Sequence, residues 1–465
     1  MFKPFRELLI MEKRTITYLL LFIGGTLSLF LSFYHDQWNV VEPEYYRLWE
    51  RTYERVVIAR LAKSQQDGIF SNAGLLGLAE AEESWNFDPD RQYEIYLKGE
   101  QVNGYRAYRS HPGFQGFVFS LIDRNTNFSP LLNIEIYRAI VSLNSAVVIS
   151  LLATGMAMEF GWLPGILILA FSSISEWMIL PGGNTYWNLW SFYLPFLAGI
   201  FFLEEEAKKN THTASKMYFA IFAAILIKIL FSGFEMITTT LIMATVPFVY
   251  YAILNKWGRV FWERMTHLGI VLSLATVSGL LVLSIQIAIN DGNFTSSIDY
   301  ISKTLERRAF GDPDDYKGPK AESLQTNDLS VIVTYLNINA FNSQDPSRIW
   351  QRPYWEIIVF FAVCTILFIA RHRTLMLAGK IRKGIALIVA TWYSLAAPLS
   401  WYVIFTATSY DHPFLFPMAW QMPFVLLGFA LCGYVFQDLF KTKNIRNTFL
   451  PSQSSQTDSP LPQHQ

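Results

Sequence analysis

Three carboxylates follow the first long apolar run of the chain and are its first candidates for acid–base chemistry. The run, residues 15–34, carries no charge, and Asp36, Glu42 and Glu44 come soon after it. About twenty apolar residues in a helix cross the hydrocarbon core of a bilayer, which is roughly 30 Å thick. We therefore expect these carboxylates at the membrane surface, where one of them could accept a proton from a hydroxyl.

Two basic residues are expected at the same depth and are candidates for binding a phosphate. Residues 43–67 should form an amphipathic helix on the membrane surface, with Pro43 at its first position and Arg60 on its apolar stripe. Lys228 lies inside another apolar run, about one helical turn from its end. Snorkelling or ion pairing is the simpler explanation for both side chains. Binding the phosphate of a lipid is the functional alternative.

Three further ionisable residues lie at the ends of apolar runs and complete the set of candidate substrate-binding residues. Glu235 comes seven residues after Lys228, so the two fall on roughly one face of a helix. Asp411 and His412 join the last two apolar runs, where they could also simply cap a turn. Ionisable groups in or beside membrane spans are costly and are often functional.

The composition indicates which elements must position these residues. The 465 residues are 52% hydrophobic and 16% aromatic, and the apolar residues cluster in long runs, which predicts an all-α polytopic membrane protein. About ten transmembrane helices are expected. They cover residues 15–34, 136–158, 162–180, 185–203, 217–233, 237–254, 267–289, 355–370, 384–407 and 414–436.

The distribution of basic residues between the runs predicts the orientation. Short loops rich in Lys and Arg stay in the cytoplasm, which puts both termini there and two large loops on the exterior face. We expect these loops to carry amphipathic helices and the plasma (inner) membrane to be the location. The expected segments are a cytoplasmic N-terminus (1–14), a first span (15–34), an exterior loop (35–135), spans two to seven (136–289), a second exterior loop (290–354), spans eight to ten (355–437) and a disordered cytoplasmic tail (438–465).

Several classes of function are disfavoured by the sequence. The formal net charge is zero and no long basic block occurs, which argues against nucleic acid as a partner. Cys364 and Cys432 both lie in predicted spans, so no disulfide framework is indicated. No nucleotide-binding, zinc-protease or serine-hydrolase motif is present. A divalent cation such as Mg²⁺ or Mn²⁺ is a possible cofactor, although the sequence shows no site for it.

The layout of the chain resembles one family, the GT-C glycosyltransferases. The similarity lies in a first span followed by a large exterior loop with an early acid, then many spans and a second large loop. Short phrases are similar too: residues 232–239 (SGFEMITT), 397–401 (APLSW) and 409–412 (SYDH). The resemblance implies an enzyme that uses a polyprenyl-phosphate sugar at the outer membrane face. It makes Asp36 the position that matches the family's acid, with Glu42 and Glu44 close to it.

The resemblance further implies that a sugar moves from the lipid phosphate to an acceptor hydroxyl with inversion. A carboxylate would accept the proton of the hydroxyl, and Arg60 or Lys228 would stabilise the leaving phosphate. The acceptor, whether glycan, lipid or protein, stays open. Two alternatives are a transporter or lipid flippase and a non-catalytic membrane scaffold. A transporter would place its polar groups near the middle of the bilayer, whereas these lie at the outer ends of the spans.

Overall fold

The computed structural model describes residues 3–79, 88–209, 214–341, 351–377 and 381–448, and this part of the chain is mostly helical. Among the described helices, seven are long and apolar enough to cross a membrane, and one bent pair of shorter helices would make an eighth. The protein is therefore an all-α polytopic membrane protein, as the hydropathy pattern predicts. The expected number of ten spans stays a prediction.

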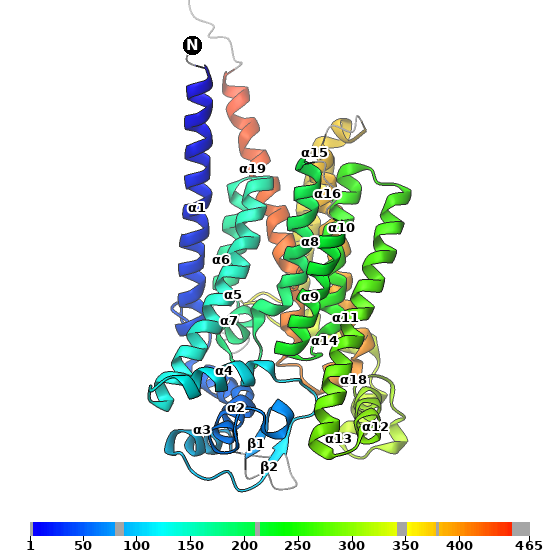
Figure 1. The fold of residues 1–465 in the computed structure, drawn as a ribbon. Helices are drawn as coiled ribbons and strands as arrows, with labels where there is room; N and C mark the ends of the chain where they lie inside the picture. The colour runs from blue at the N-terminus through cyan, green and yellow to red at the C-terminus, as the bar shows by residue number, and fades with distance from the viewer. Residues whose placement is uncertain (1–2, 80–87, 210–213, 342–350, 378–380, 449–465) are drawn as a thin grey trace, which may run out of the picture.

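The apolar helices lie side by side in one bundle (Figure 1). The seven long candidates are within α1 (Lys3–His35), α5 (Pro130–Phe160), α9 (Ala214–Ser232), α10 (Ile237–Asn255), α11 (Arg259–Asp291), α15 (Tyr354–Leu377) and the pair α16 (Arg382–Ser394) and α17 (Ala396–Ile404). The bent pair is α6 (Trp162–Ser173) and α7 (Glu176–Gly183), which meet at 73°. Two more helices, α8 (Leu189–Lys209) and α19 (Phe424–Thr448), lie in the same bundle.

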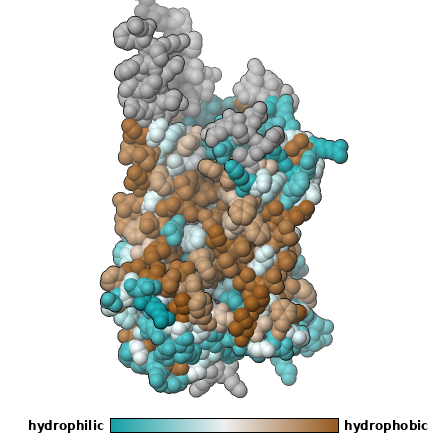
Figure 2. Space-filling model, viewed as in Figure 1, coloured by the Kyte–Doolittle hydropathy of each residue, from teal (hydrophilic) through white to brown (hydrophobic). Residues whose placement is uncertain are grey.

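Most of the other elements form a layer at the lower end of the bundle, which we call the loop layer (Figure 1). Figure 2 shows hydrophobic side chains over the bundle and hydrophilic ones over this layer. The layer contains α2 (Pro43–Asp67), η1 (Ser71–Gly74), β1 (Gly77–Ala79), α3 (Pro89–Lys98), β2 (Tyr105–Ala107), α4 (Phe114–Asn125), α12 (Phe294–Leu305), η2 (Glu306–Phe310), η3 (Pro313–Asp315), α13 (Pro319–Gln325), α14 (Asp328–Asn337), α18 (Thr406–Asp411) and η4 (Phe416–Gln421). Three separate parts of the chain therefore meet here.

Helix α2 begins and ends as the sequence predicts, but its apolar stripe faces protein. Pro43 is in the first turn and the N–H of Gly68 donates to the carbonyl of Ser64. The stripe, including Val57 and Arg60, is buried against α3, α4 and β1. Helix α2 is thus part of the folded loop layer, rather than a helix that lays its apolar face on lipid.

A two-stranded sheet fixes the segment that follows β2. Strands β1 and β2 are antiparallel, with Gly77 opposite Ala107 and Leu78 opposite Arg106. Glycine is required at position 77 because a Cβ atom there would lie 2.5 Å from the carbonyl oxygen of Arg106. The close pairing holds the backbone of β2 and of the residues just after it against the layer.

Several element boundaries differ from the expected ones. Helix α1 continues upstream of residue 15 as far as Lys3, and α5 begins at Pro130 rather than at 136. Helix α19 extends to Thr448, so residues 438–448 are helical where a disordered tail was expected. The rest of the expected tail, residues 449–465, lies outside the described part of the chain.

Candidate functional site

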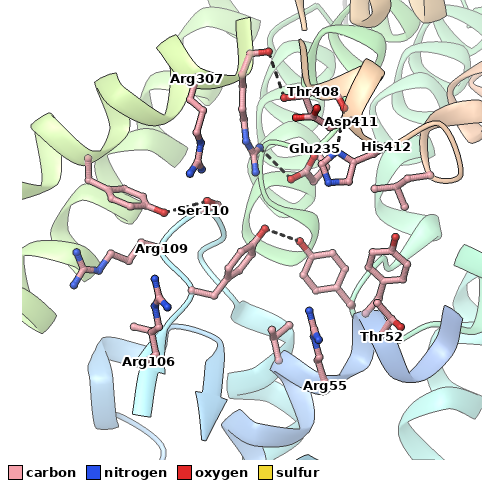
Figure 3. Close-up of a pocket in the computed structure, with 18 of the residues that line it drawn as sticks. Thr52, Arg55, Arg106, Arg109, Ser110, Glu235, Arg307, Thr408, Asp411 and His412 are labelled. Carbon is pink, nitrogen blue, oxygen red and sulfur yellow. Dashed lines mark hydrogen bonds and ion pairs between the residues drawn. The ribbon is translucent and has the colours of Figure 1, made fainter. Parts of the chain in front are cut away.

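A large cavity opens where the loop layer meets the ends of the bundle helices. Its volume is about 1210 Å³, and it lies between α2, β2, the turn from α9 to α10, the end of α11, η2 and α18. Figure 3 shows the polar side chains that point into it. Six cationic side chains line it (Arg55, Arg106, Arg109, Arg307, Arg308 and Lys320), against three carboxylates (Glu235, Asp291 and Asp411).

Each of the three carboxylates pairs with one of the cations. The distances between nitrogen and oxygen are 3.1 Å for Arg308–Glu235, 2.8 Å for Arg109–Asp291 and 2.8 Å for Lys320–Asp411. Each pair joins segments that lie far apart in the sequence, so the pairs help to assemble the cavity wall. Six cations outnumber three carboxylates, and the cavity therefore has a positive potential that would attract an anionic ligand.

Glu235 is presented to the cavity by a turn that Lys228 holds in place. Lys228 is fully buried, and its ammonium group donates to the carbonyl oxygens of Gly233 at 2.9 Å and Glu235 at 2.5 Å. Gly233 and Met236 in this turn have positive φ angles of 59° and 49°. A buried cation is stable only when such acceptors surround it. Lys228 does not line the cavity, so its direct effect is on the turn that carries Glu235.

Helix α18 supplies Asp411 and is followed by His412. The hydroxyl of Thr408 donates to the carbonyl oxygen of Arg308 at 3.3 Å, which ties α18 to η2. The Nδ1 atom of His412 lies 3.0 Å from the carbonyl oxygen of Thr408, and the hydroxyl of Tyr335 donates to the carbonyl oxygen of His412 at 3.1 Å. These contacts hold the short helix at the cavity, as the figure of the site also shows (Figure 3).

The floor of the cavity carries a pair of tyrosines beside the Arg308–Glu235 ion pair. The hydroxyls of Tyr108 and Tyr186 lie 3.4 Å apart. Burial raises the pKa of both phenols above the usual value, so both stay neutral. Burial lowers the pKa of Arg308, but the Glu235 carboxylate outweighs this and raises it above its usual value. Burial alone lowers the pKa of Arg55.

A buried charge network fixes α2, and with it Arg55, to the bundle. Glu54 is fully buried and its Oε2 accepts hydrogen bonds from Arg138 of α5 at 2.7 and 3.0 Å and from the Tyr93 hydroxyl at 2.8 Å. Its Oε1 accepts from the backbone N–H of Thr185 at 2.9 Å. Because Glu54 points into this network, its neighbour Arg55 points toward the cavity (Figure 3).

The three carboxylates proposed as catalytic from the sequence do not line this cavity. Asp36 is 7% exposed, and its two carboxylate oxygens accept from the backbone N–H groups of Val40 at 3.0 Å and Val41 at 2.7 Å. Glu42 precedes the first turn of α2, Glu44 lies within it, and both are exposed. The structure thus gives Asp36 a capping contact, and a catalytic role for these three stays a prediction.

Arg60 also lies outside the cavity lining. Its guanidinium donates to the carbonyl oxygen and hydroxyl of Ser71, both at 2.8 Å, and to the carbonyl oxygen of Ile69 at 2.5 Å. These bonds tie α2 to the turn that follows it. Of the substrate-binding candidates, the structure brings together Glu235, Asp411 and His412 and leaves Arg60 and Lys228 as supports around them.

Most of the arginines of the cavity are not among the candidate residues predicted from the sequence. Arg106 and Arg109 flank the end of β2, and Arg307 and Arg308 are adjacent in η2. In the sequence, these residues stand out only as two arginines close together in each of two loops of mixed charge. Which loops meet is set by tertiary contacts, so the common site was not visible.

Known proteins give no further indication of what the cavity binds. Comparison of the chain with protein families, with curated proteins and with solved structures finds no match. Among the described residues, no group of three or more His, Cys, Asp or Glu side chains is arranged to hold a metal ion. The conclusions about function therefore depend on the cavity itself.

Proposed function

We propose that the protein is an integral membrane glycosyltransferase that moves a sugar from a polyprenyl-phosphate donor to an acceptor hydroxyl, with inversion. The observation that carries this proposal is the cationic cavity at the end of the bundle, with Glu235 among its lining residues. A lipid-linked phosphate needs cations at the level where its apolar tail leaves the bilayer. A carboxylate beside them is what the transfer of a sugar requires.

Apolar side chains in the lining suit the donor. Trp187, Leu415 and Phe416 line the same cavity as Arg55 of α2. A polyprenyl tail would stay among the helices while its phosphate enters the cavity. Arginine can bind two phosphate oxygens at once, and such charge-assisted bonds are about twice as strong as neutral ones.

Glu235 is the general base in this proposal. The acceptor oxygen attacks the anomeric carbon, the bond from that carbon to the phosphate oxygen breaks, and its electron pair stays on the phosphate. The proton of the acceptor hydroxyl passes to the Glu235 carboxylate. Attack from the side opposite the leaving phosphate inverts the anomeric carbon. Lys320 and Asp411, which are paired at 2.8 Å, would orient the sugar between the donor phosphate and the acceptor.

We further propose ten spans, with the cavity on the exterior face of the plasma membrane. The bent pair α6–α7 would be one span, and α8 and the apolar part of α19 would each be another, in addition to the seven long apolar segments. The basic residues Lys256, just after α10, and Arg259, at the start of α11, lie at the end of the bundle away from the cavity, which supports a cytoplasmic assignment for that end.

The test is release of polyprenyl phosphate from a panel of polyprenyl-phosphate sugars by the full-length protein in nanodiscs with membrane glycolipids as acceptors. We expect release by the natural protein, and loss of release for Glu235→Gln. Glu94→Gln is the matched control, because Glu94 is an exposed carboxylate of α3 outside the cavity. Transbilayer movement of intact donor, with no release, would instead support a flippase.

A further inference from the structure

The cavity carries more positive charge than one lipid phosphate needs. The lining holds six cationic side chains against three carboxylates, a formal excess of three positive charges. A phosphodiester donor carries one negative charge, and a phosphate monoester product carries between one and two. An excess of cationic side chains therefore remains when the donor is bound.

Three of the six cations lie on one side of the cavity. Arg106, Arg109 and Arg307 are on this side, across the cavity from Asp411 and His412 (Figure 3). Two of them come from the β2 segment and one from η2, so the group forms only when both loops are folded. Glu235 lies near Asp411 and His412, on the opposite side (Figure 3).

One of the three arginines is held in place by a chain of polar contacts. Arg109 pairs with Asp291 at 2.8 Å, and its guanidinium lies 5.7 Å from the centre of the Tyr300 ring. Asp291 accepts from the amide of Asn290 at 2.8 Å, and Asn290 accepts in turn from Asn72 at 3.1 Å. This chain joins the end of α11 to η1 and positions Arg109 before any ligand binds.

Arg307 has the opposite character and is available to a ligand. It is exposed, and within the described part of the chain it has no hydrogen-bond or ion-pair partner. Its guanidinium nevertheless points into the cavity (Figure 3). An arginine that neither pairs nor packs gives the fold little stability, so its substitution should leave the fold intact.

We infer that Arg106, Arg109 and Arg307 form a second anion subsite, which takes the phosphate group of a phosphate-bearing acceptor. This inference rests on the proposed function, because it names the class of acceptor for the same reaction. Three guanidinium groups around one phosphate provide charge-assisted, partly bidentate hydrogen bonds. The phosphate would fix the acceptor so that its hydroxyl faces Glu235.

The test measures binding of a soluble probe, glucose 6-phosphate, by isothermal titration calorimetry. The full-length protein is held in phosphatidylcholine nanodiscs and saturated with undecaprenyl phosphate. We expect the probe to bind, and Arg307→Glu to weaken its affinity about tenfold or more through loss of a charge-assisted bond and added repulsion. Arg307→Glu should leave the affinity for undecaprenyl phosphate within about twofold.

The matched control is Arg124→Glu, which makes the same charge change at an exposed arginine of α4 outside the cavity. It should leave the affinity for the probe unchanged. Equal weakening by both substitutions would overturn the subsite, since the effect would then be one of overall charge. Glucose in place of glucose 6-phosphate should not bind, and equal binding of the two would also overturn it.

Two outcomes separate this inference from the proposed function. Binding of undecaprenyl phosphate without binding of glucose 6-phosphate would overturn the second subsite and leave the proposed function standing. Binding of glucose 6-phosphate that depends on Arg307, without binding of undecaprenyl phosphate, would support the anion subsite. It would overturn the proposal that the donor is a polyprenyl-phosphate sugar.

The source of the acceptor phosphate is tested by the nanodisc lipid. Replacing part of the phosphatidylcholine with phosphatidic acid should compete with the probe if the acceptor is itself a lipid. Unchanged probe affinity in phosphatidic acid would support a water-soluble or glycan-borne phosphate.

Discussion

At the scale of single residues, the role that a carboxylate can take depends on which groups its oxygens already bind. Asp36 and Glu235 both lie beside apolar runs, and the sequence favours Asp36 as the catalytic acid and Glu235 as a substrate-binding residue. In the structure both oxygens of Asp36 accept backbone N–H groups, whereas Glu235 pairs with Arg308 through one oxygen and faces the cavity. The two carboxylates should therefore respond differently to neutralisation.

Glu235→Gln should lower sugar transfer by roughly 10²–10⁴-fold, the usual contribution of a general base. Its midpoint of thermal unfolding should change little, because an amide still fits beside Arg308. Asp36→Asn should do the reverse: loss of a capping acceptor costs about 1 kcal/mol of stability, and the transfer rate is kept. Measuring both quantities for both variants decides this. A reversed pattern would return the role of base to Asp36, as first expected from the sequence.

Glu50 is the residue that should make stability depend on pH. Burial, and then the nearby Glu54 carboxylate, raise the pKa of Glu50 from 4.5 to about 8. Between these pH values the folded protein holds a proton that the unfolded chain releases. The free energy of unfolding should therefore be highest below pH 4.5 and should fall as the pH rises toward 8.

Glu50→Gln should flatten this pH dependence and raise stability at pH 8. Thermal unfolding of both proteins in detergent across this range is the measurement. Exposed Glu44→Gln, on the same helix, is the control and should leave the natural slope unchanged. A natural slope that persists in Glu50→Gln would show that another group holds the proton.

At the scale of elements, the turn between α9 and α10 links the bundle to the site. The ammonium group of Lys228 donates hydrogen bonds to the carbonyl oxygens of Gly233 and Glu235 in this turn. Among the described contacts, no other side chain donates to these two oxygens. Methionine at this position would fill similar space but leave both carbonyl oxygens without that donor. An unsatisfied buried acceptor costs about 1–3 kcal/mol.

Lys228→Met should therefore lower both the unfolding midpoint and the rate of transfer, with Glu235 displaced from Arg308. Affinity for undecaprenyl phosphate should fall less, because Lys228 does not line the cavity. Lys216→Met, an exposed lysine near the start of the same helix, is the control. Full stability and full activity of Lys228→Met would contradict the positioning role.

The same elements show what the sequence can and cannot predict. Hydropathy predicts the long apolar helices, and Pro43 with Gly68 predicts the bounds of α2, because both signals are local. Glu235, Asp411 and His412 were found because ionisable groups beside apolar runs stand out. Arg106 and Arg307 were missed because their meeting depends on strand pairing and on contacts between distant loops.

At the scale of the whole molecule, the proposed orientation places the loop layer outside the cell and the opposite end of the bundle inside. Single cysteines at Lys98, in α3, and at Lys256, after α10, sit in these two regions. A membrane-impermeant thiol reagent added to intact cells should label Lys98→Cys and not Lys256→Cys, and lysis should expose the second site. Cys364 and Cys432 are buried and serve as the background in the natural protein. Labelling of Lys256→Cys alone would invert the orientation.

The central claim is that the cationic cavity binds a lipid-linked phosphate, and the affinity for undecaprenyl phosphate tests it most directly. The full-length protein in phosphatidylcholine nanodiscs is compared with Arg55→Ala and with Arg47→Ala, an exposed arginine on the same helix outside the cavity. We predict that the natural protein binds, that Arg55→Ala weakens the affinity about tenfold or more, and that Arg47→Ala leaves it unchanged. No binding by the natural protein, or equal affinity for all three, would contradict the claim.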